Sequence, residues 1–396
     1  MLHFTNIGEK FRIVTNITIK SNPKPDDIID YLCAFDSRKK ENTSAVIPSH
    51  YEAGGSTELS AAILVGTMAR NKFVGPFQAA GIKYLDINSH LLKTLPGLVA
   101  LQLSNYSNSK PNDIALKHFT FKTICDLNEG LLEDSIDDFL SKYRHNYTMI
   151  ECDPQYPVSK KYEGSNKLLD LDKFQSFFAN CRTKLEAAIS EKGLRPSDVN
   201  NRFKMFRFLA ELHKNSTEYS LSHDEDNNLV PGIRITRLTA HVSKQSLLLE
   251  QFSDNSIIQD YISRVTKPRS AFTGIMEVSV SDFGKGIIKH FLNSPRGMYY
   301  DSEEPSEILS RLILTRLSSK PPDVAGLGMY KVLKAARYLR ACISVRTDKF
   351  WCVLPFDISN DKILSDTKLL SQAFEDSKSC HVSGTHWQMY WPLVDL

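Results

Sequence analysis

Residues 275–286 constrain the fold of this chain most, because an apolar strand there runs directly into a turn rich in glycine. Residues 275–280 have the composition of a buried strand, and Asp282, Gly284 and Gly286 follow in an Asp-x-Gly-x-Gly turn. A carboxylate at a strand end can accept a hydrogen bond from an amino group, and glycines let the backbone approach a flat ligand. A tight turn without a ligand explains the same spacing. The pattern predicts the strand and the turn and leaves the role of the turn open.

A predicted helix upstream of this turn carries three polar side chains on one face. Residues 197–220 have apolar residues at helical spacing, and Glu211, Asn215 and Glu218 stand at positions i, i+4 and i+7. These side chains could work together in a site. A stripe of Glu and Asn is also typical of a solvent-exposed helix face.

Two further glycine motifs follow toward the C-terminus. Gly326-Leu327-Gly328 opens a predicted helix, and Gly384-Thr385 begins the last predicted strand. Backbone amides at a helix N-terminus can bind phosphate, and a threonine hydroxyl can donate a hydrogen bond to one. Simple helix entry would explain the first of these motifs equally well.

The order of these four elements resembles the GHKL ATPases, the superfamily with the Bergerat ATP-binding fold. Its members include gyrase-type topoisomerases, heat-shock chaperones, mismatch-repair ATPases, sensor histidine kinases and anti-sigma-factor serine kinases. The resemblance covers residues 195–396. It implies an α+β chain in which a Bergerat-type α/β sandwich, a mixed sheet covered by helices on one face, follows a smaller N-terminal α/β domain.

The resemblance also implies cofactors, ATP and Mg²⁺, and roles for the motif residues. Asn215 matches the residue that binds the Mg²⁺ ion on the triphosphate, and Glu211 matches the catalytic base that activates the attacking water or hydroxyl. Asp282 matches the carboxylate that binds adenine. The remaining nucleotide-binding positions that it implies are Glu218, Gly284, Gly286, Gly326, Leu327, Gly328 and Thr385.

Two insertions separate this chain from compact members of that superfamily. The first lies between Asn215 and Asp282 and contains residues 233–252, which predict an extra strand and helix. The second covers residues 356–378. A mobile lid is expected before the second glycine motif, and its possible phosphate contacts are Arg296, Arg311, Arg316 and Lys320.

Composition excludes several classes of protein. Lys and Arg number 49 against 46 Asp and Glu, and a net charge of +3 is too small to bind nucleic acid or membranes by bulk electrostatics. The longest apolar stretch falls short of the roughly 20 residues of a membrane helix, and no secretory signal opens the chain. Seven scattered cysteines suggest reduced thiols, and Cys380, His381 and His386 are poorly spaced for zinc. We therefore expect a cytoplasmic protein.

The N-terminal part is expected to be a separate input or partner-binding domain. A segment rich in proline and charge, residues 153–166, has the composition of a linker or a long loop. The expected boundaries are an N-terminal α/β domain over 1–155, a linker over 156–167 and the ATP-binding domain over 168–396. The elements expected in the first domain are a strand over 11–20, helices over 26–35 and 58–70, and strands over 81–87 and 118–124.

Alternative readings of the motifs are weaker. Lys289 stands where a dinucleotide-binding fingerprint requires its third glycine. His90 lies in a sequence faintly like a histidine-kinase acceptor box, but residues 96–148 look strand-like and turn-rich instead of forming two long helices. The few residues after Thr385 disfavour topoisomerase and mismatch-repair roles, which normally need a transducer domain.

Three functions stay open at this point. The first is a regulatory enzyme that hydrolyses ATP or transfers its phosphate to a partner protein, such as a STAS-like signalling protein. The second is an ATP-dependent switch or scaffold without catalysis, and the third is an α/β interaction module whose glycines are structural. A homodimer is compatible with all three.

Overall fold

The chain divides into two compact units, Met1–Asp126 and Leu127–Leu396. The computed structural model describes residues 15–21, 31, 43–48, 55–70, 78–79, 94–103, 120–125, 146–152, 171–197, 202–219, 222–223, 229–230, 232–253, 255–266, 272–315, 317–319, 328–357, 361–376 and 381–395.

The first unit combines a parallel sheet with helices. Its strands follow the order β1-β2-β3, and both pairings are parallel. Two apolar helices, α2 and α4, pack against each other. The bounds are β1 (Thr15–Thr18), β2 (Thr43–Ile47), β3 (Gln78–Ala79), α2 (Gly55–Arg70) and α4 (Leu95–Leu103). The expected α/β character is confirmed for the described residues, as are the strand within 11–20 and the helix over 58–70.

Two predictions in this unit are wrong. Residues 120–125 are helical, although a strand was expected over 118–124. Phe121, Ile124 and Cys125 are buried there, and their i, i+3, i+4 spacing is that of a helix. Helix α4 also covers the start of the stretch 96–148, which was expected to be strand-like and turn-rich. The Thr94 hydroxyl precedes this helix and accepts a hydrogen bond from the Gly97 amide at 3.2 Å. Three further predictions lie outside the described residues. They concern His90, the strand over 81–87 and the helix over 26–35, of which only residue 31 is described.

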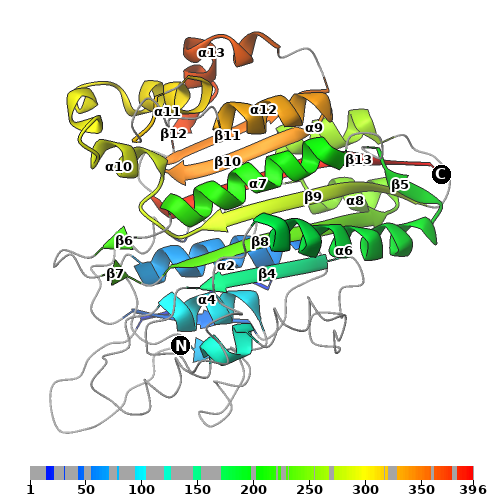
Figure 1. The fold of residues 1–396 in the computed structure, drawn as a ribbon. Helices are drawn as coiled ribbons and strands as arrows, with labels where there is room; N and C mark the ends of the chain where they lie inside the picture. The colour runs from blue at the N-terminus through cyan, green and yellow to red at the C-terminus, as the bar shows by residue number, and fades with distance from the viewer. Residues whose placement is uncertain are drawn as a thin grey trace, which may run out of the picture. The chain divides into compact units, whose positions relative to one another are not determined.

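The second unit is built on an antiparallel sheet of eight strands (Figure 1). Its order is β12-β11-β10-β13-β9-β8-β4, with β5 paired to β13. The bounds are β4 (Asn146–Cys152), β5 (Leu194–Pro196), β8 (Ile233–Ser243), β9 (Thr273–Asp282), β10 (Cys342–Asp348), β11 (Phe350–Pro355), β12 (Glu375–Asp376) and β13 (Val382–Asp395), and β6 (Ser222–His223) pairs separately with β7 (Leu229–Val230). Every pairing of the large sheet is antiparallel in the described residues, whereas a mixed sheet was expected.

Helices cover both faces of this sheet, whereas one covered face was expected. On one face, α6 (Leu171–Ser190), α7 (Arg202–Tyr219) and α12 (Gly328–Tyr338) share an apolar core with strand residues such as Val280 and Trp387. Figure 1 shows α6 and α7 in front of the sheet, with α7 running roughly along the direction of β9 and β10. On the opposite face, α8 (Gln245–Gln251) and α9 (Ser256–Val265) pack on Ile275, Cys342 and Tyr390. The extra strand and helix expected over 233–252 are confirmed as β8 and α8.

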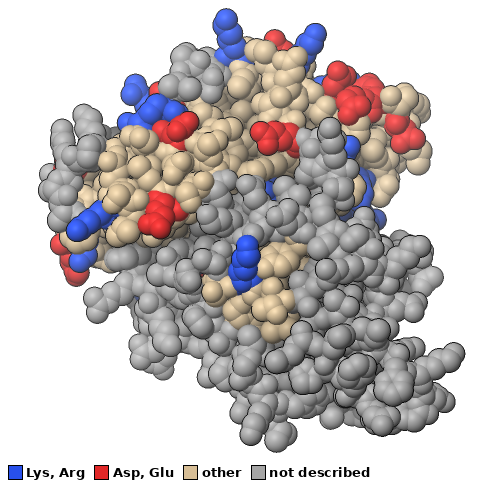
Figure 2. Space-filling view, turned by 180° about the vertical axis from the view of Figure 1, so that it is seen from behind, with Lys and Arg blue, Asp and Glu red and all other residues tan. Residues whose placement is uncertain are grey.

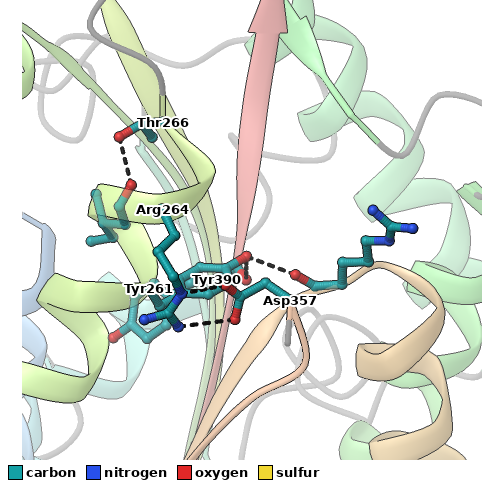
Figure 3. Close-up of polar contacts among 7 residues, drawn as sticks. Tyr261, Arg264, Thr266, Asp357 and Tyr390 are labelled. Carbon is teal, nitrogen blue, oxygen red and sulfur yellow. Dashed lines mark hydrogen bonds and ion pairs between the residues drawn. The ribbon is translucent and has the colours of Figure 1, made fainter. Parts of the chain in front are cut away.

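Helix α9 is fixed to the sheet by polar contacts as well as by packing (Figure 3). The buried Tyr261 hydroxyl lies 3.0 Å from the backbone carbonyl oxygens of both Arg340 and Tyr390. Arg264 pairs with Asp357 through Nε to Oδ2 at 2.6 Å and Nη2 to Oδ1 at 3.1 Å. Burial raises the pKa of Tyr261, so its hydroxyl stays protonated and can donate. The insertion is therefore an integral part of the sheet's second covered face.

The segment expected to form a lid contains three short helical elements joined by turns in its described part. It contains α10 (Ile287–Leu292), a 3₁₀ turn η2 (Gly297–Tyr300) and α11 (Pro305–Leu314). Phe291, Ile308 and Leu312 form a small apolar cluster there with Leu317. The second insertion contributes η3 (Asp361–Leu364) and α13 (Thr367–Gln372), and α13 contacts α11 through a 3.0 Å hydrogen bond from Ser371 to Ser306.

Strand β4 belongs to the second unit, although the expected boundary at 155 assigns it to the first domain. It pairs with β8 along its whole length, from Asn146 opposite Thr239 to Cys152 opposite Ile233. The proline-rich segment expected as a linker, residues 153–166, lies outside the described residues. In the described residues, no helix has the length and apolar character needed to cross a membrane.

Candidate functional site

Four polar side chains form a row across one end of the sheet. Arg234 on β8 pairs with Asp282 on β9, Asp282 pairs with Thr385 on β13, and Thr385 pairs with Thr347 on β10. Directly paired residues of antiparallel strands point to the same face. The row therefore lies on the face that α6, α7 and α12 cover, at the edge of an otherwise apolar surface. We call Asp282, Thr347, Gly384 and Thr385 the strand-end group.

Asp282 is held by the turn that follows it. Its side chain is buried, and Oδ1 accepts a hydrogen bond from the Gly284 amide at 2.9 Å. Gly384 on the neighbouring strand has a φ of +85°, and a Cβ at that position would lie 1.9 Å from the Asp282 carbonyl oxygen. Only glycine fits such a close approach of two strands. The Gly284 amide therefore holds the Asp282 side chain, and the close approach of Gly384 restricts the Asp282 backbone.

Thr347 connects the two glycine motifs that meet at this end of the sheet. Its hydroxyl accepts a hydrogen bond from the Ile287 amide at 3.1 Å and lies 3.2 Å from both the Gly384 carbonyl oxygen and the Thr385 hydroxyl. Gly286 has a φ of +81°, and a Cβ there would lie 3.2 Å from the Thr347 hydroxyl. Sequence reasoning does not single out Thr347, because nothing within its own strand marks a residue that bridges distant motifs.

Asp348 is a buried carboxylate beside the same turn. A Cβ on Gly286 would lie 2.9 Å from Asp348 Oδ2, which has no hydrogen-bond partner among the described residues. Burial raises the pKa of Asp348 to about 6, against the opposing effects of the Lys289 charge and of the backbone amides of Lys289 and Ile288. The Asp348 carboxyl thus binds the backbone at the start of α10, and its burial in the ionised form costs free energy.

A second set of candidate residues meets where α7 faces the start of α12. A Cβ on Gly328 would lie 3.0 Å from Glu211 Oε2 and 3.8 Å from the Asn215 amide nitrogen. Lys331, three residues into α12, donates from Nζ to Glu211 Oε1 at 2.8 Å. We call Glu211, Asn215, Gly328 and Lys331 the helix group. Sequence reasoning misses Lys331, and its place one helical turn after Gly328 is the signal that could have found it.

The two groups border one core. Helix α7 contacts both β9 and α12, and Leu212, Val280 and Val332 belong to the same apolar cluster. The structure thus brings Glu211 and Asn215 against Gly328, and Asp282 against Thr385. The Glu218 side chain, Gly326 and Leu327 lie outside the described residues.

The expected lid cations differ in their partners. Arg311 donates to Glu303 at 2.7 Å and its guanidinium lies 5.0 Å from the centre of the Tyr300 ring. Arg296 has a buried Nη1 that makes no hydrogen bond within the described part of the chain. Arg316 and Lys320 lie outside that part. Of the two described cations, Arg296 is therefore the one with an unpaired hydrogen-bond donor within the described residues.

A separate polar network on the opposite face of the sheet is internally satisfied. Glu277 Oε2 lies 2.7 Å from His241 Nε2, and Glu277 Oε1 accepts hydrogen bonds from Ser279 at 2.6 Å and Gln388 at 3.2 Å. Burial alone would raise the pKa of Glu277, but the partners His241 and Ser279 bring it below its ordinary value. These contacts account for the buried carboxylate without a ligand.

His386 lies on that opposite face. Burial lowers its pKa to about 3, so the ring is neutral, and its Nε2 lies 3.0 Å from the Ser383 carbonyl oxygen. In the described residues no three His, Cys, Asp or Glu side chains gather as a metal site. Cys380, one of the cysteine–histidine set considered above, lies outside them.

Surface charge is mixed where it can be followed. Figure 2 shows Lys and Arg interspersed with Asp and Glu on the face seen from behind Figure 1, and neither sign covers the described part of that face. This distribution agrees with the small net charge of +3.

No protein-family model matches the chain, and searches of curated proteins and of solved structures found no match either. A functional conclusion therefore rests on the residues of the strand-end and helix groups.

Proposed function

We propose that the C-terminal unit is an ATP-binding regulatory module of the GHKL type, which binds Mg-ATP and hydrolyses it or transfers its phosphate to a partner protein. The observation that carries the proposal is the contact of Gly328 with Glu211 and Asn215. These residues belong to separate motifs, and the order of the motifs along the chain resembles that superfamily. Their meeting supports a shared site more strongly than either motif alone.

The helix group fits a magnesium ion bound to phosphate. Mg²⁺ prefers oxygen ligands and commonly takes only one or two from the protein, with phosphates and water as the rest. Asn215 offers an amide oxygen 3.9 Å from the Cβ position of Gly328, at the start of α12. Asn215 would hold the ion, and bound Mg²⁺ would neutralise phosphate charge.

The strand-end group fits an adenine base. The Asp282 carboxylate can accept a hydrogen bond from an exocyclic amino group, and Gly284 and Gly286 present backbone without side chains. Thr385 lies beside Asp282 in register and offers a hydroxyl. Glu211 is the candidate base, and Arg296 is the described lid cation with a buried guanidinium nitrogen available for a phosphate.

One observation favours a second function, an ATP-dependent switch without turnover. Lys331 occupies Oε1 of Glu211, so the carboxylate that would accept a proton already has a cationic partner. In this alternative the output is a change in affinity for a signalling partner, such as a STAS-like protein, or for a second copy of the chain.

Measurements of turnover and of nucleotide binding by Glu211→Ala distinguish these functions. If the protein is an enzyme, the variant should bind Mg-ATP but lose phosphate release or transfer, because Glu211 acts on the nucleophile. The matched control is Glu250→Ala, which removes an exposed carboxylate from α8 on the opposite sheet face. Equal turnover in wild type and Glu211→Ala would remove Glu211 from the role. Binding without turnover in wild type would support the switch, and no binding at all would leave an interaction module.

A further inference from the structure

The first turn of α12 contacts both carboxylate oxygens of Glu211. Oε2 lies 3.0 Å from the Cβ position of Gly328, and Oε1 lies 2.8 Å from Lys331 Nζ. Residues three apart on a helix lie on the same side, so Gly328 and Lys331 act on Glu211 as one surface. Lys331 therefore sets where the Glu211 carboxylate points.

The pair is accessible enough to break. The Lys331 side chain is 37% exposed and that of Glu211 is 21% exposed, and ion pairs in such surroundings contribute little to stability. Lysine carries its charge on a flexible four-carbon stem, so Nζ can change partner without movement of the helix. A single carboxylate is a weak competitor for that charge against a group with several negative charges.

We propose that Lys331 exchanges between Glu211 and a phosphate group, so that Glu211 is released when a nucleoside triphosphate is bound. This inference rests on the proposed function, because it assumes that nucleotide binds beside the helix group. It assigns Lys331 as a positioning residue in the free protein and as the residue that distinguishes ATP from ADP. Glu211 then becomes available only when a triphosphate occupies the site.

Calorimetric titration of Lys331→Met with the magnesium complexes of ADP and of the non-hydrolysable ATP analogue AMPPNP tests the exchange. We expect the analogue to bind about tenfold more weakly, the loss of one charged hydrogen bond, and ADP to change by less than about threefold. Lys334→Met is the matched control, because Lys334 is exposed on the same helix and its Nζ lies 5.6 Å from the Tyr330 ring centre. That control should leave both affinities unchanged.

Glu211→Gln supplies an independent readout. It removes the competing carboxylate charge, so the analogue should bind more tightly than to wild type, and the gain should disappear in the double variant with Lys331→Met. Lys331→Gln serves as a second substitution at the same position and should repeat the loss of discrimination.

The outcomes distinguish failure of the Lys331 exchange from failure of the proposed nucleotide site. Equal changes for both nucleotides, or no change, would overturn the exchange while wild-type binding still supports the nucleotide site. A wild-type protein that binds neither nucleotide would overturn the proposed function, and the exchange with it.

Discussion

The strand-end group and the helix group are built in opposite ways. Asp282 is buried, fixed by the Gly284 amide, and pressed by a neighbouring strand that tolerates no Cβ at Gly384. Glu211 is part-exposed and held by a lysine that is itself part-exposed. Backbone hydrogen bonds and close packing fix the first group, whereas a side-chain ion pair holds the second. In the proposed nucleotide site, the strand-end group is the rigid half and the helix group is the adjustable half.

The largest effect should come from adding one methyl group to the rigid half. Gly384→Ala places a Cβ 1.9 Å from the Asp282 carbonyl oxygen at a φ of +85°, so the strands must separate. We expect a loss of more than about 3 kcal/mol in the free energy of unfolding, measured by urea denaturation.

Gly193→Ala is the control for this substitution. Gly193 has a similar φ of +72°, but a Cβ there would meet nothing within 4 Å. Only the backbone strain of about 1 kcal/mol remains in that case. Equal losses at the two positions would show that the close approach at Asp282 is not a strong constraint.

A pH-dependent effect of intermediate size is expected at Asp348. Its pKa is raised in the folded protein from 3.8 to about 6, so the folded state binds a proton more tightly than the unfolded state. The contribution of Asp348 to the free energy of unfolding is fully present below pH 3.8, and it is lost as the pH rises to about 6. Asp348→Asn should therefore be more stable than wild type at pH 7.5, by roughly 3 kcal/mol, and should lose that advantage near pH 4.

Urea denaturation of wild type and Asp348→Asn across this pH range measures the effect. Asp366→Asn is the matched control, because Asp366 caps α13 by accepting hydrogen bonds from the Lys368 and Leu369 amides and asparagine caps as well. A stability difference at Asp348 that stays constant with pH would mean that the carboxyl does not titrate as described.

The smallest effect is expected in the adjustable half. Lys331→Met should change the free energy of unfolding by less than about 1 kcal/mol in the absence of nucleotide, because both partners are part-exposed. A double-mutant cycle with Glu211→Gln, followed by thermal unfolding, isolates the pair. A coupling several times larger would make Lys331 a structural residue and blur the contrast between the two groups.

The parts of this arrangement that follow from local patterns could be predicted from the sequence. Glu211 and Asn215 share a helix face, and Asp282 ends a buried strand, because helical spacing and strand composition are local properties. The pairing of β4 with β8 could not be predicted, since strand partners distant in the chain are chosen by the whole core. Thr347 could not be predicted for the same reason, whereas the place of Lys331 one helical turn after Gly328 is a local signal.

Calorimetric titration of the full chain with Mg-ATP, wild type beside Asp282→Asn, tests the central claim most directly. We predict saturable binding by wild type that Asp282→Asn abolishes, because the substitution removes the negative charge and replaces one of the two acceptor oxygens with an amide donor. Absence of binding by wild type, or equal binding by both proteins, would contradict the assignment of this site.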